Sequence, residues 1–354
     1  MVFSHYTERG WTVDNLWHIF TDFYGGQYAP LAFLSYLVLY AGFGYDPFYF
    51  HMFSLLLHIG CVCLVWKLIS SLLRVHGGVS EKQILYVNFI TTLLFAVHPI
   101  NVEAVAWISA LKVLLYAFFY LLGLLCYLRY IRTSKIFYYV LTIGCFLCSF
   151  WGKEQAVTFP LALLIVDWFT NRNMKNLEVW SEKMSFLIMA FFFGIITVLS
   201  QGKGPYEMIF PLYQRLLFGC FALVEYITKS LLPVNLNFFY PFPIVLGEEP
   251  PLHYYLYPVV LLFLMGWIIA YRNNRYLVFG VLLFLVNLLF SIHLFNMSRH
   301  AIVADRYMYL SYVGIAFLIA NGIWWLRKRL SYFKAALVFL FCSAAKILSL
   351  RHLP

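Results

Sequence analysis

The chain has 354 residues, of which 63% are hydrophobic and only 11% are charged, and its mean hydropathy is +0.80. A soluble domain carries about 25% charged residues, and no soluble fold of this size hides so much apolar surface. The composition therefore predicts an all-α, polytopic integral membrane protein with a single membrane domain over residues 1–354. The net charge of +10 is scattered through short loops, so we expect no nucleic-acid partner.

The first part of the chain is too polar to cross a bilayer. Residues 1–29 are polar and aromatic and contain no cleavable signal sequence. Thr12 is suited to cap a short amphipathic helix that lies on the membrane surface. Residues 31–40 are apolar but too short to span easily. We therefore interpret residues 1–46 as part of a first outer loop with surface-lying helices.

The remaining chain is a series of apolar runs. A helix that begins at Asp46-Pro47 and runs to about Leu73 crosses the roughly 30 Å of bilayer hydrocarbon at 1.5 Å per residue. Further spans are expected at 84–98, 110–130, 136–152, 155–171, 183–200, 253–271, 277–294, 308–326 and 333–349. This gives about ten transmembrane helices, several of them short for a full crossing.

Loop charges orient the spans. More than half of the 25 Lys and Arg residues lie in alternate loops, and positive residues favour cytoplasmic loops. We therefore expect the N-terminus outside. The preferred location is the bacterial inner (plasma) membrane, or the endoplasmic reticulum membrane if the source is eukaryotic. A span at 212–232 would break the charge pattern, so we expect a re-entrant or surface-lying pair of helices within an outer loop or re-entrant segment, 201–252.

The connector at residues 98–112 joins two long apolar runs and is rich in polar groups. An ionisable group at membrane depth is costly and predicts a functional site. His98 and Glu103 are therefore candidate catalytic residues, placed where a lipid headgroup meets a water-soluble acceptor. The alternative is an interfacial cap in which Pro99 starts a helix and Glu103 lies near its positive end.

The expected outer face also carries cations that the charge rule disfavours there. Arg306, Lys153 and Lys112 are candidates for binding a phosphate, because Arg offers a planar fork of donors and Lys a point charge. The alternative for Arg306 is a salt bridge to Asp305 or another carboxylate. The alternative for Lys153 is an ion pair with Glu154.

Further candidates accompany these cations. Glu154, Asp305 and Tyr307 are outer-face site candidates, and Lys203, Arg299 and His300 belong to the same face. Asp167, beside Trp168 near a cytoplasmic end, is interpreted as an interfacial residue. No group of residues has the spacing of a metal site, so none is predicted, and a requirement for a divalent ion stays open.

Several motifs occur in a fixed order. They are Gly25-Gly-Gln-Tyr28 with Gly44-Tyr-Asp-Pro47, His98-Pro99 with Glu103-Ala-Val-Ala-Trp107, Lys153-Glu154 with Pro160, residues 236–243, and Ala304-Asp-Arg-Tyr307 with Tyr309-Leu310. This series resembles the membrane region of the transmembrane and tetratricopeptide-repeat proteins and their bacterial relatives, within the GT-C glycosyltransferase superfamily. The resemblance covers most of residues 10–325.

The resemblance implies a GT-C-like fold and a glycosyltransferase. The enzyme would move a sugar from a polyprenyl-phosphate carrier, dolichyl-phosphate mannose in the animal branch, to an acceptor on the outer side, such as protein Ser/Thr hydroxyls. Arg306 would hold the lipid phosphate with Lys153 or Lys112 as a second cation, and Glu103 and His98 would line the acceptor side. The implied partners are membrane lipid, the lipid-linked sugar and a protein or glycan acceptor.

The chain departs from this family in three places. Relatives have a first membrane helix followed by an acidic pair that supplies the base, and this chain begins just past that position. Val113 stands where relatives usually carry an Asp, and the helical repeats that many relatives append are missing. A catalytically inactive, truncated relative and a flippase or transporter of a lipid-linked glycan are therefore alternatives, and enzymatic activity stays open.

Overall fold

The computed structural model describes residues 4–201, 210–237, 239–293 and 301–329. The expected span at 333–349 and the candidates Lys203, Arg299 and His300 lie outside these residues. In chain order the α-helices are α1 (His5–Glu8), α2 (Val13–Thr21), α3 (Pro30–Phe43), α4 (Pro47–His76), α5 (Glu81–Val97), α6 (Val102–Ala106), α7 (Leu111–Thr133), α8 (Ile136–Gly152), α9 (Phe159–Phe169), α10 (Leu177–Gln201), α11 (Leu212–Leu231), α12 (Leu256–Ala270), α13 (Arg275–Leu288) and α14 (Met308–Arg329).

Short 3-10 helices and one small sheet complete the described structure. The 3-10 helices are η1 (Pro99–Asn101), η2 (Ile108–Ala110), η3 (Glu154–Thr158), η4 (Leu252–Tyr255) and η5 (Asp305–Tyr307). Strands β1 (Tyr240–Pro241) and β2 (Ala301–Val303) pair antiparallel, with Tyr240 opposite Val303. The predicted all-α, polytopic class is confirmed.

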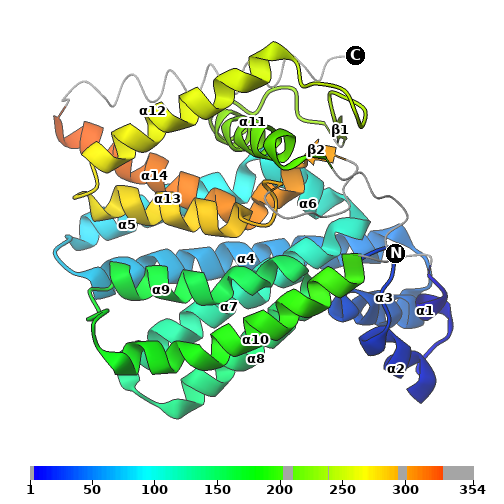
Figure 1. Cartoon of the computed structure of the whole chain (residues 1–354). Helices are drawn as coiled ribbons and strands as arrows, with labels where there is room; N and C mark the ends of the chain where they lie inside the picture. The colour runs from blue at the N-terminus through cyan, green and yellow to red at the C-terminus, as the bar shows by residue number, and fades with distance from the viewer. Residues whose placement is uncertain (1–3, 202–209, 238, 294–300, 330–354) are drawn as a thin grey trace.

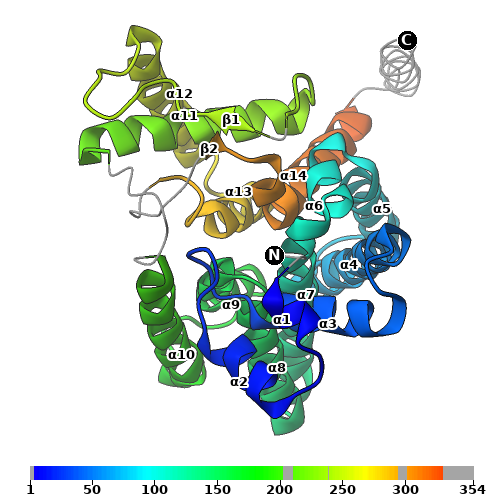
Figure 2. The ribbon, with the colours of Figure 1, turned by 90° about the vertical axis from the view of Figure 1, so that its right-hand side faces the viewer.

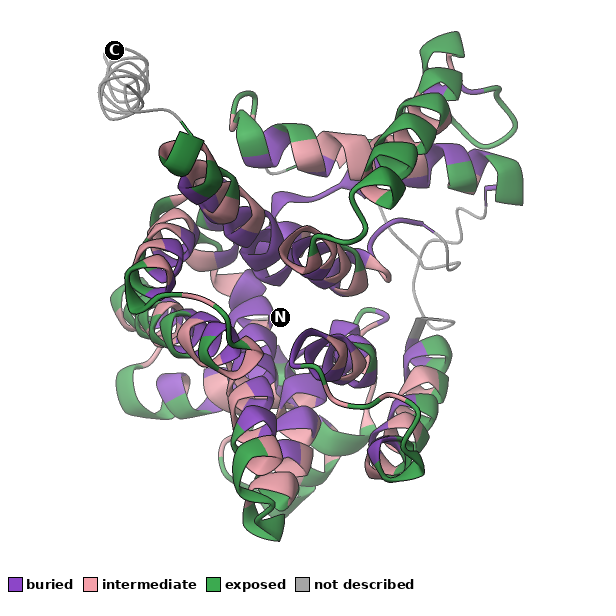
Figure 3. Cartoon of the chain, turned by 90° about the vertical axis from the view of Figure 1, so that its left-hand side faces the viewer, coloured by how far each residue is buried: buried purple, intermediate pink, exposed green. Residues whose placement is uncertain are grey.

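The long helices run side by side along a common axis, which Figure 1 shows lengthwise and Figure 2 shows nearly end-on. Helix α7 packs against α4 and α8, α14 packs against α5 and α13, and their inner faces form the core. In Figure 3 the buried residues, in purple, lie on the faces that these helices turn toward one another. A Cβ added at Gly314 would lie 2.5 Å from the carbonyl oxygen of Gly280. Small residues here let α13 and α14 approach closely, as is common between membrane helices.

Five helical segments are long and apolar enough to cross a membrane, and the bent pair Glu81–Val97 and Pro99–Ala106 makes a sixth if it counts as one span. The five are Pro47–His76, Ile108–Thr133, Leu177–Ser200, Leu252–Ala270 and Asp305–Arg329. Fewer described helices reach full length than the ten expected. One reason is that polar residues open short 3-10 turns: η3 occupies residues 154–158, so α9 begins only at Phe159.

Helix α11 lies across the bundle. In Figure 2 its axis runs across the picture, whereas the bundle helices point toward the viewer. The first helix of the expected pair is present and ends at Leu231, before Pro233. The second is not, because the described residues between Leu231 and Leu252 contain no helix. The buried side chains of α11 include Phe218, Ala222 and Tyr226, which are four residues apart and share one face. An amphipathic helix of this kind is suited to lie in a membrane surface.

The two ends of the bundle differ in composition. At one end, on the left of Figure 1, lie the connections after α4, α7, α9 and α12, which carry the Lys and Arg residues predicted to be cytoplasmic. We call this the basic end. Helices α1, α2, α3 and α6, the sheet and η5 lie toward the opposite end, which we call the site end.

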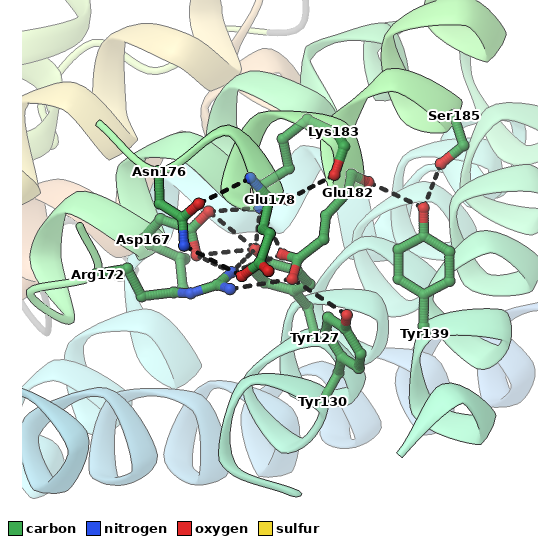
Figure 4. A network of polar contacts seen from close by, with 12 residues as sticks. Tyr127, Tyr130, Tyr139, Asp167, Arg172, Asn176, Glu178, Glu182, Lys183 and Ser185 are labelled. Atoms are coloured by element: carbon green, nitrogen blue, oxygen red, sulfur yellow. Dashed lines mark hydrogen bonds and ion pairs between the residues drawn. The ribbon is translucent and has the colours of Figure 1, made fainter. Parts of the chain in front are cut away.

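A buried network of charges joins α7, α9 and α10 at the basic end (Figure 4). Asp167 and Lys183 are both 0% exposed, and Lys183 Nζ lies 2.6 Å from Asp167 Oδ2. Arg172 bridges Asp167 at 3.2 Å and Glu182 at 2.7 Å, and the Tyr127 hydroxyl donates to Asp167 at 2.8 Å. Asp167 is therefore neutralised by two cations inside the protein, and its interfacial position stays a prediction.

Candidate functional site

The connector after α5 folds into three short helical segments, η1, α6 and η2. The first two, Pro99–Ala106, are bent by 49° from α5. His98 caps the end of α5, and its Nδ1 accepts a hydrogen bond from the Ile100 backbone N–H at 3.3 Å. Pro99 occupies the first position of η1, where its missing N–H costs nothing. The turns place Glu103 on α6, at the site end of the bundle.

Glu103 forms an ion pair with Arg306. One carboxylate oxygen of Glu103 accepts the Arg306 backbone N–H at 2.7 Å, and the other accepts the guanidinium at 2.5 Å. Their side chains are 10% and 18% exposed. Arg306 therefore pairs with a carboxylate, as the alternative interpretation held, and the partner is Glu103.

Cations gather around the Tyr307 ring. The Arg306 guanidinium carbon lies 5.0 Å from the centre of that ring and also 5.0 Å from the centre of the Trp107 ring. Lys153 Nζ, on a residue that is only 3% exposed, lies 4.6 Å from the centre of the Tyr307 ring. Cations over aromatic faces are attracted by the ring quadrupole. Tyr307 is thus in contact with two of the three predicted phosphate-binding cations.

Lys112 belongs to the same group. Its ammonium donates a hydrogen bond to the side-chain oxygen of Gln27. Its electrostatic surroundings include the charges of Glu154, Lys153 and Arg306. Segments that are far apart in sequence, around residues 27, 103–112, 153 and 306, therefore converge at one end of the bundle.

A cavity of about 780 Å³ opens beside the ion pair. Its lining includes two carboxylates, Glu103 and Asp305, in a wall that is otherwise mainly apolar. The lining residues are Pro99, Val102, Glu103, Ala106, Trp107, Leu236, Asn237 and Asp305. A mainly apolar pocket with a few converging polar groups is typical of a ligand site.

Asp305 is held by two residues for which the sequence predicted no role. The Tyr240 hydroxyl lies 2.9 and 3.2 Å from the two carboxylate oxygens of Asp305, and Lys229 Nζ donates to that hydroxyl at 3.0 Å. The antiparallel pairing of β1 with β2 brings Tyr240 to Asp305. Burial, together with the nearby charge of Asp305, raises the pKa of Tyr240. Its hydroxyl therefore stays protonated and acts as a donor.

Tyr240 and Lys229 differ in how visible they are in the sequence. Tyr240 lies in the motif at residues 236–243, an aromatic, Pro-rich stretch that by itself predicts no role for the tyrosine. Lys229 stands near the end of α11 like an ordinary helix-terminal cation, so only the three-dimensional structure reveals it.

The other predicted candidates lie at the margin of the site. The His98 ring packs against Tyr312, with ring centres 4.3 Å apart. In the described structure His98 is not among the cavity-lining residues, and neither are the cations Arg306, Lys112 and Lys153. Glu154 is half-buried and begins η3. Within the described ranges, no three His, Cys, Asp or Glu side chains are grouped so that they could hold a metal ion.

Comparison with known proteins supports the motif resemblance. The chain is 33% identical to human protein O-mannosyl-transferase TMTC2 over 189 residues, which are 49% of this chain and 21% of that protein. It is 30% identical to tmtc2 of Xenopus laevis over 203 residues, which are 52% of this chain and 23% of that protein.

The resemblance is confirmed. A third relative, Drosophila melanogaster protein O-mannosyl-transferase Tmtc3, is 28% identical over 172 residues, which are 43% of this chain and 18% of that protein. The chain thus spans about a fifth of the length of these protein O-mannosyl-transferases. No family model and no solved structure matches the chain.

Proposed function

We propose that the chain is a GT-C-type glycosyltransferase. It transfers a sugar, mannose by analogy with the names of its relatives, from a polyprenyl-phosphate carrier to a protein hydroxyl on the outer side of the membrane. The observation that carries this proposal is the ion pair between Glu103 and Arg306 at the edge of a cavity of about 780 Å³. A cation fixed beside a mainly apolar cavity suits a ligand with a phosphate and a lipid chain.

The cations provide the binding chemistry that a lipid phosphate needs. A guanidinium has five N–H donors, and the described Glu103 contact uses one of them. The others can engage phosphate oxygens in the bidentate manner that Arg favours. Lys153, just after α8, and Lys112 on α7 add positive charge. Glu103 orients the guanidinium.

The same cations favour the chemical step. When a sugar leaves a polyprenyl phosphate, negative charge builds up on the phosphate. Donors that are already placed at that charge lower the barrier, because they need no reorganisation during the reaction. The site end is also the predicted outer side, where the phosphate of a lipid carrier lies at headgroup level.

The proposal is tested by a transfer assay. The purified chain in lipid nanodiscs is mixed with dolichyl-phosphate or undecaprenyl-phosphate mannose carrying a radiolabel, and with a peptide rich in Ser and Thr. We expect label to move to the peptide, and Arg306→Ala to lower the rate by about 100-fold or more. The matched control Arg9→Ala, at an exposed arginine near the N-terminus, should retain the rate. No transfer by the wild type from either donor would contradict the proposal.

A further inference from the structure

The cavity wall offers groups that suit an uncharged, hydroxyl-bearing ligand. Its described lining contains the carboxylates of Glu103 and Asp305 and also Asn237, whereas Arg306 stands outside it. Arg306 compensates the charge of Glu103 by direct contact. Asp305 is instead held by a neutral donor, the Tyr240 hydroxyl at 2.9 Å. Because like charges repel strongly beside an apolar wall, a phosphate belongs on the Arg306 side. The part of the wall at Asp305 and Asn237, which we call the polar corner, suits a neutral group.

The Tyr240 hydroxyl holds the polar corner together. It donates to the carboxylate of Asp305, and it accepts the Lys229 ammonium at 3.0 Å and the Asn237 backbone N–H at 2.5 Å. A hydroxyl has one proton and two lone pairs, and these three contacts match that capacity. One phenol therefore fixes Asp305, which opens η5, relative to Asn237 in the loop after α11.

Asp305 has acceptor capacity beyond its bond to Tyr240. An ionised carboxylate offers about four lone-pair sites, and the single proton of the Tyr240 hydroxyl engages only one of them at a time. Asp305 is 3% exposed, so bulk water has little access to this group. Hydroxyl groups of a sugar are suitable donors for a carboxylate in such a place. Asn237, which also lines the cavity, carries an amide that both donates and accepts.

The polar corner is adjacent to the proposed phosphate position. Asp305 directly precedes Arg306 in η5, so their Cα atoms are about 3.8 Å apart. Their side chains reach different elements, because Asp305 contacts Tyr240 on β1 and Arg306 contacts Glu103 on α6. In a lipid-linked sugar the sugar is bonded directly to the phosphate. A phosphate on Arg306 therefore brings the sugar within reach of the polar corner.

We infer that Asp305 and Asn237 bind the sugar of the donor, and that Tyr240 and Lys229 position Asp305. This inference rests on the proposed function and specifies its substrate class as an uncharged hexose with free hydroxyl groups. The carboxylate of Asp305 accepts hydrogen bonds from those hydroxyls. A site built to bind a substrate hydroxyl discriminates strongly against a ligand that lacks it. An acidic sugar is rejected, because it would place a second carboxylate beside Asp305.

The test compares two lipids, dolichyl-phosphate mannose and dolichyl phosphate, by native mass spectrometry of the purified chain. Asp305→Ala should weaken the binding of the mannosyl lipid by about tenfold, because hydrogen bonds from the sugar to a charged group are lost. The same variant should bind dolichyl phosphate as tightly as the wild type or more tightly, because a negative charge near the phosphate is removed. The matched control Asp14→Ala, at an exposed carboxylate on α2, should bind both lipids as the wild type does.

The two lipids separate a sugar-binding role from a structural one. Equal weakening of both lipids in Asp305→Ala, or an unchanged affinity for the mannosyl lipid, would overturn the inference and leave the proposed function intact. Tyr240→Phe keeps the carboxylate but removes its donor, so it should weaken only the mannosyl lipid, by about threefold. If Asp305→Ala does not fold, an unchanged affinity for the mannosyl lipid in Tyr240→Phe would overturn the inference. A wild type that binds neither lipid would overturn the proposed function itself.

Discussion

The carboxylate of Glu103 accepts hydrogen bonds from both the backbone and the guanidinium of Arg306, although 203 residues separate the two in the chain. Because one residue supplies both donors, the direction of the guanidinium is fixed relative to α6. The pair ties the connector after α5 to the start of α14, at the edge of the cavity. It therefore links the structure of this end of the bundle to the phosphate binding that we propose there.

Glu103 and Arg306 should be energetically coupled. Glu103→Ala and Arg306→Ala should each lower the Tm of the purified protein, and the double variant should lose less stability than the sum of the two. Residues in direct contact typically couple by about 0.5–3 kcal/mol. Thermal unfolding of all four forms measures this coupling. Strictly additive losses would show that the pair contributes nothing to stability.

Lys153 should contribute to donor binding. Lys153→Met keeps a long side chain against Tyr307 but removes the charge, so we expect the KM for a polyprenyl-phosphate sugar to rise roughly tenfold, equal to about 1.4 kcal/mol. Lys67→Met, at an exposed lysine on α4, is the control and should leave KM unchanged. An unchanged KM in Lys153→Met would remove Lys153 from the site.

In the buried charge network at the basic end, replacing one charged residue should lower stability strongly. Replacing both partners of an ion pair should lower it much less. Lys183→Met leaves the fully buried Asp167 with less compensation. We therefore expect a loss of about 3–5 kcal/mol, whereas Lys183→Met with Asp167→Leu should be much closer to neutral. Lys175→Met, at an exposed lysine in the same loop, is the control. Chemical denaturation of the four proteins measures the differences, and a double variant as unstable as Lys183→Met would contradict this explanation.

The predicted orientation can be tested with single cysteines. After the seven native Cys residues are replaced by Ser or Ala, Arg9→Cys and Lys175→Cys place one thiol at each end. Because positive loops favour the cytoplasm, an impermeant maleimide should label position 9 in intact cells and position 175 only after permeabilisation. The opposite labelling pattern would show that the N-terminus is inside.

Much of the fold was predictable because membrane helices leave a strong local signal. Each expected span between residues 46 and 326 contains a described helix, and the loops with many Lys and Arg residues lie at one end of the bundle. The full lengths were not predictable, since polar residues such as Glu154 open 3-10 turns that shorten the helix. The transverse path of α11 depends on packing against other elements, which no local pattern encodes.

The site was predictable in part. The predicted outer face, where positive residues are disfavoured, suggested Arg306, Lys153 and Lys112, and the structure brings these residues together. Which carboxylate pairs with Arg306 depends on a contact across 203 residues, so the sequence left it open. Lys229 and Tyr240 were missed because the β1–β2 pairing, and not sequence spacing, brings Tyr240 to Asp305.

Binding of a lipid phosphate tests the central claim most directly. Native mass spectrometry of the purified chain with dolichyl phosphate should show one bound lipid on the wild type and on Arg9→Ala. Arg306→Ala should bind at least about tenfold more weakly, because a charge-assisted contact to the phosphate is lost. Equal binding by the wild type and a folded Arg306→Ala variant would contradict the claim that Arg306 holds the phosphate of a lipid carrier.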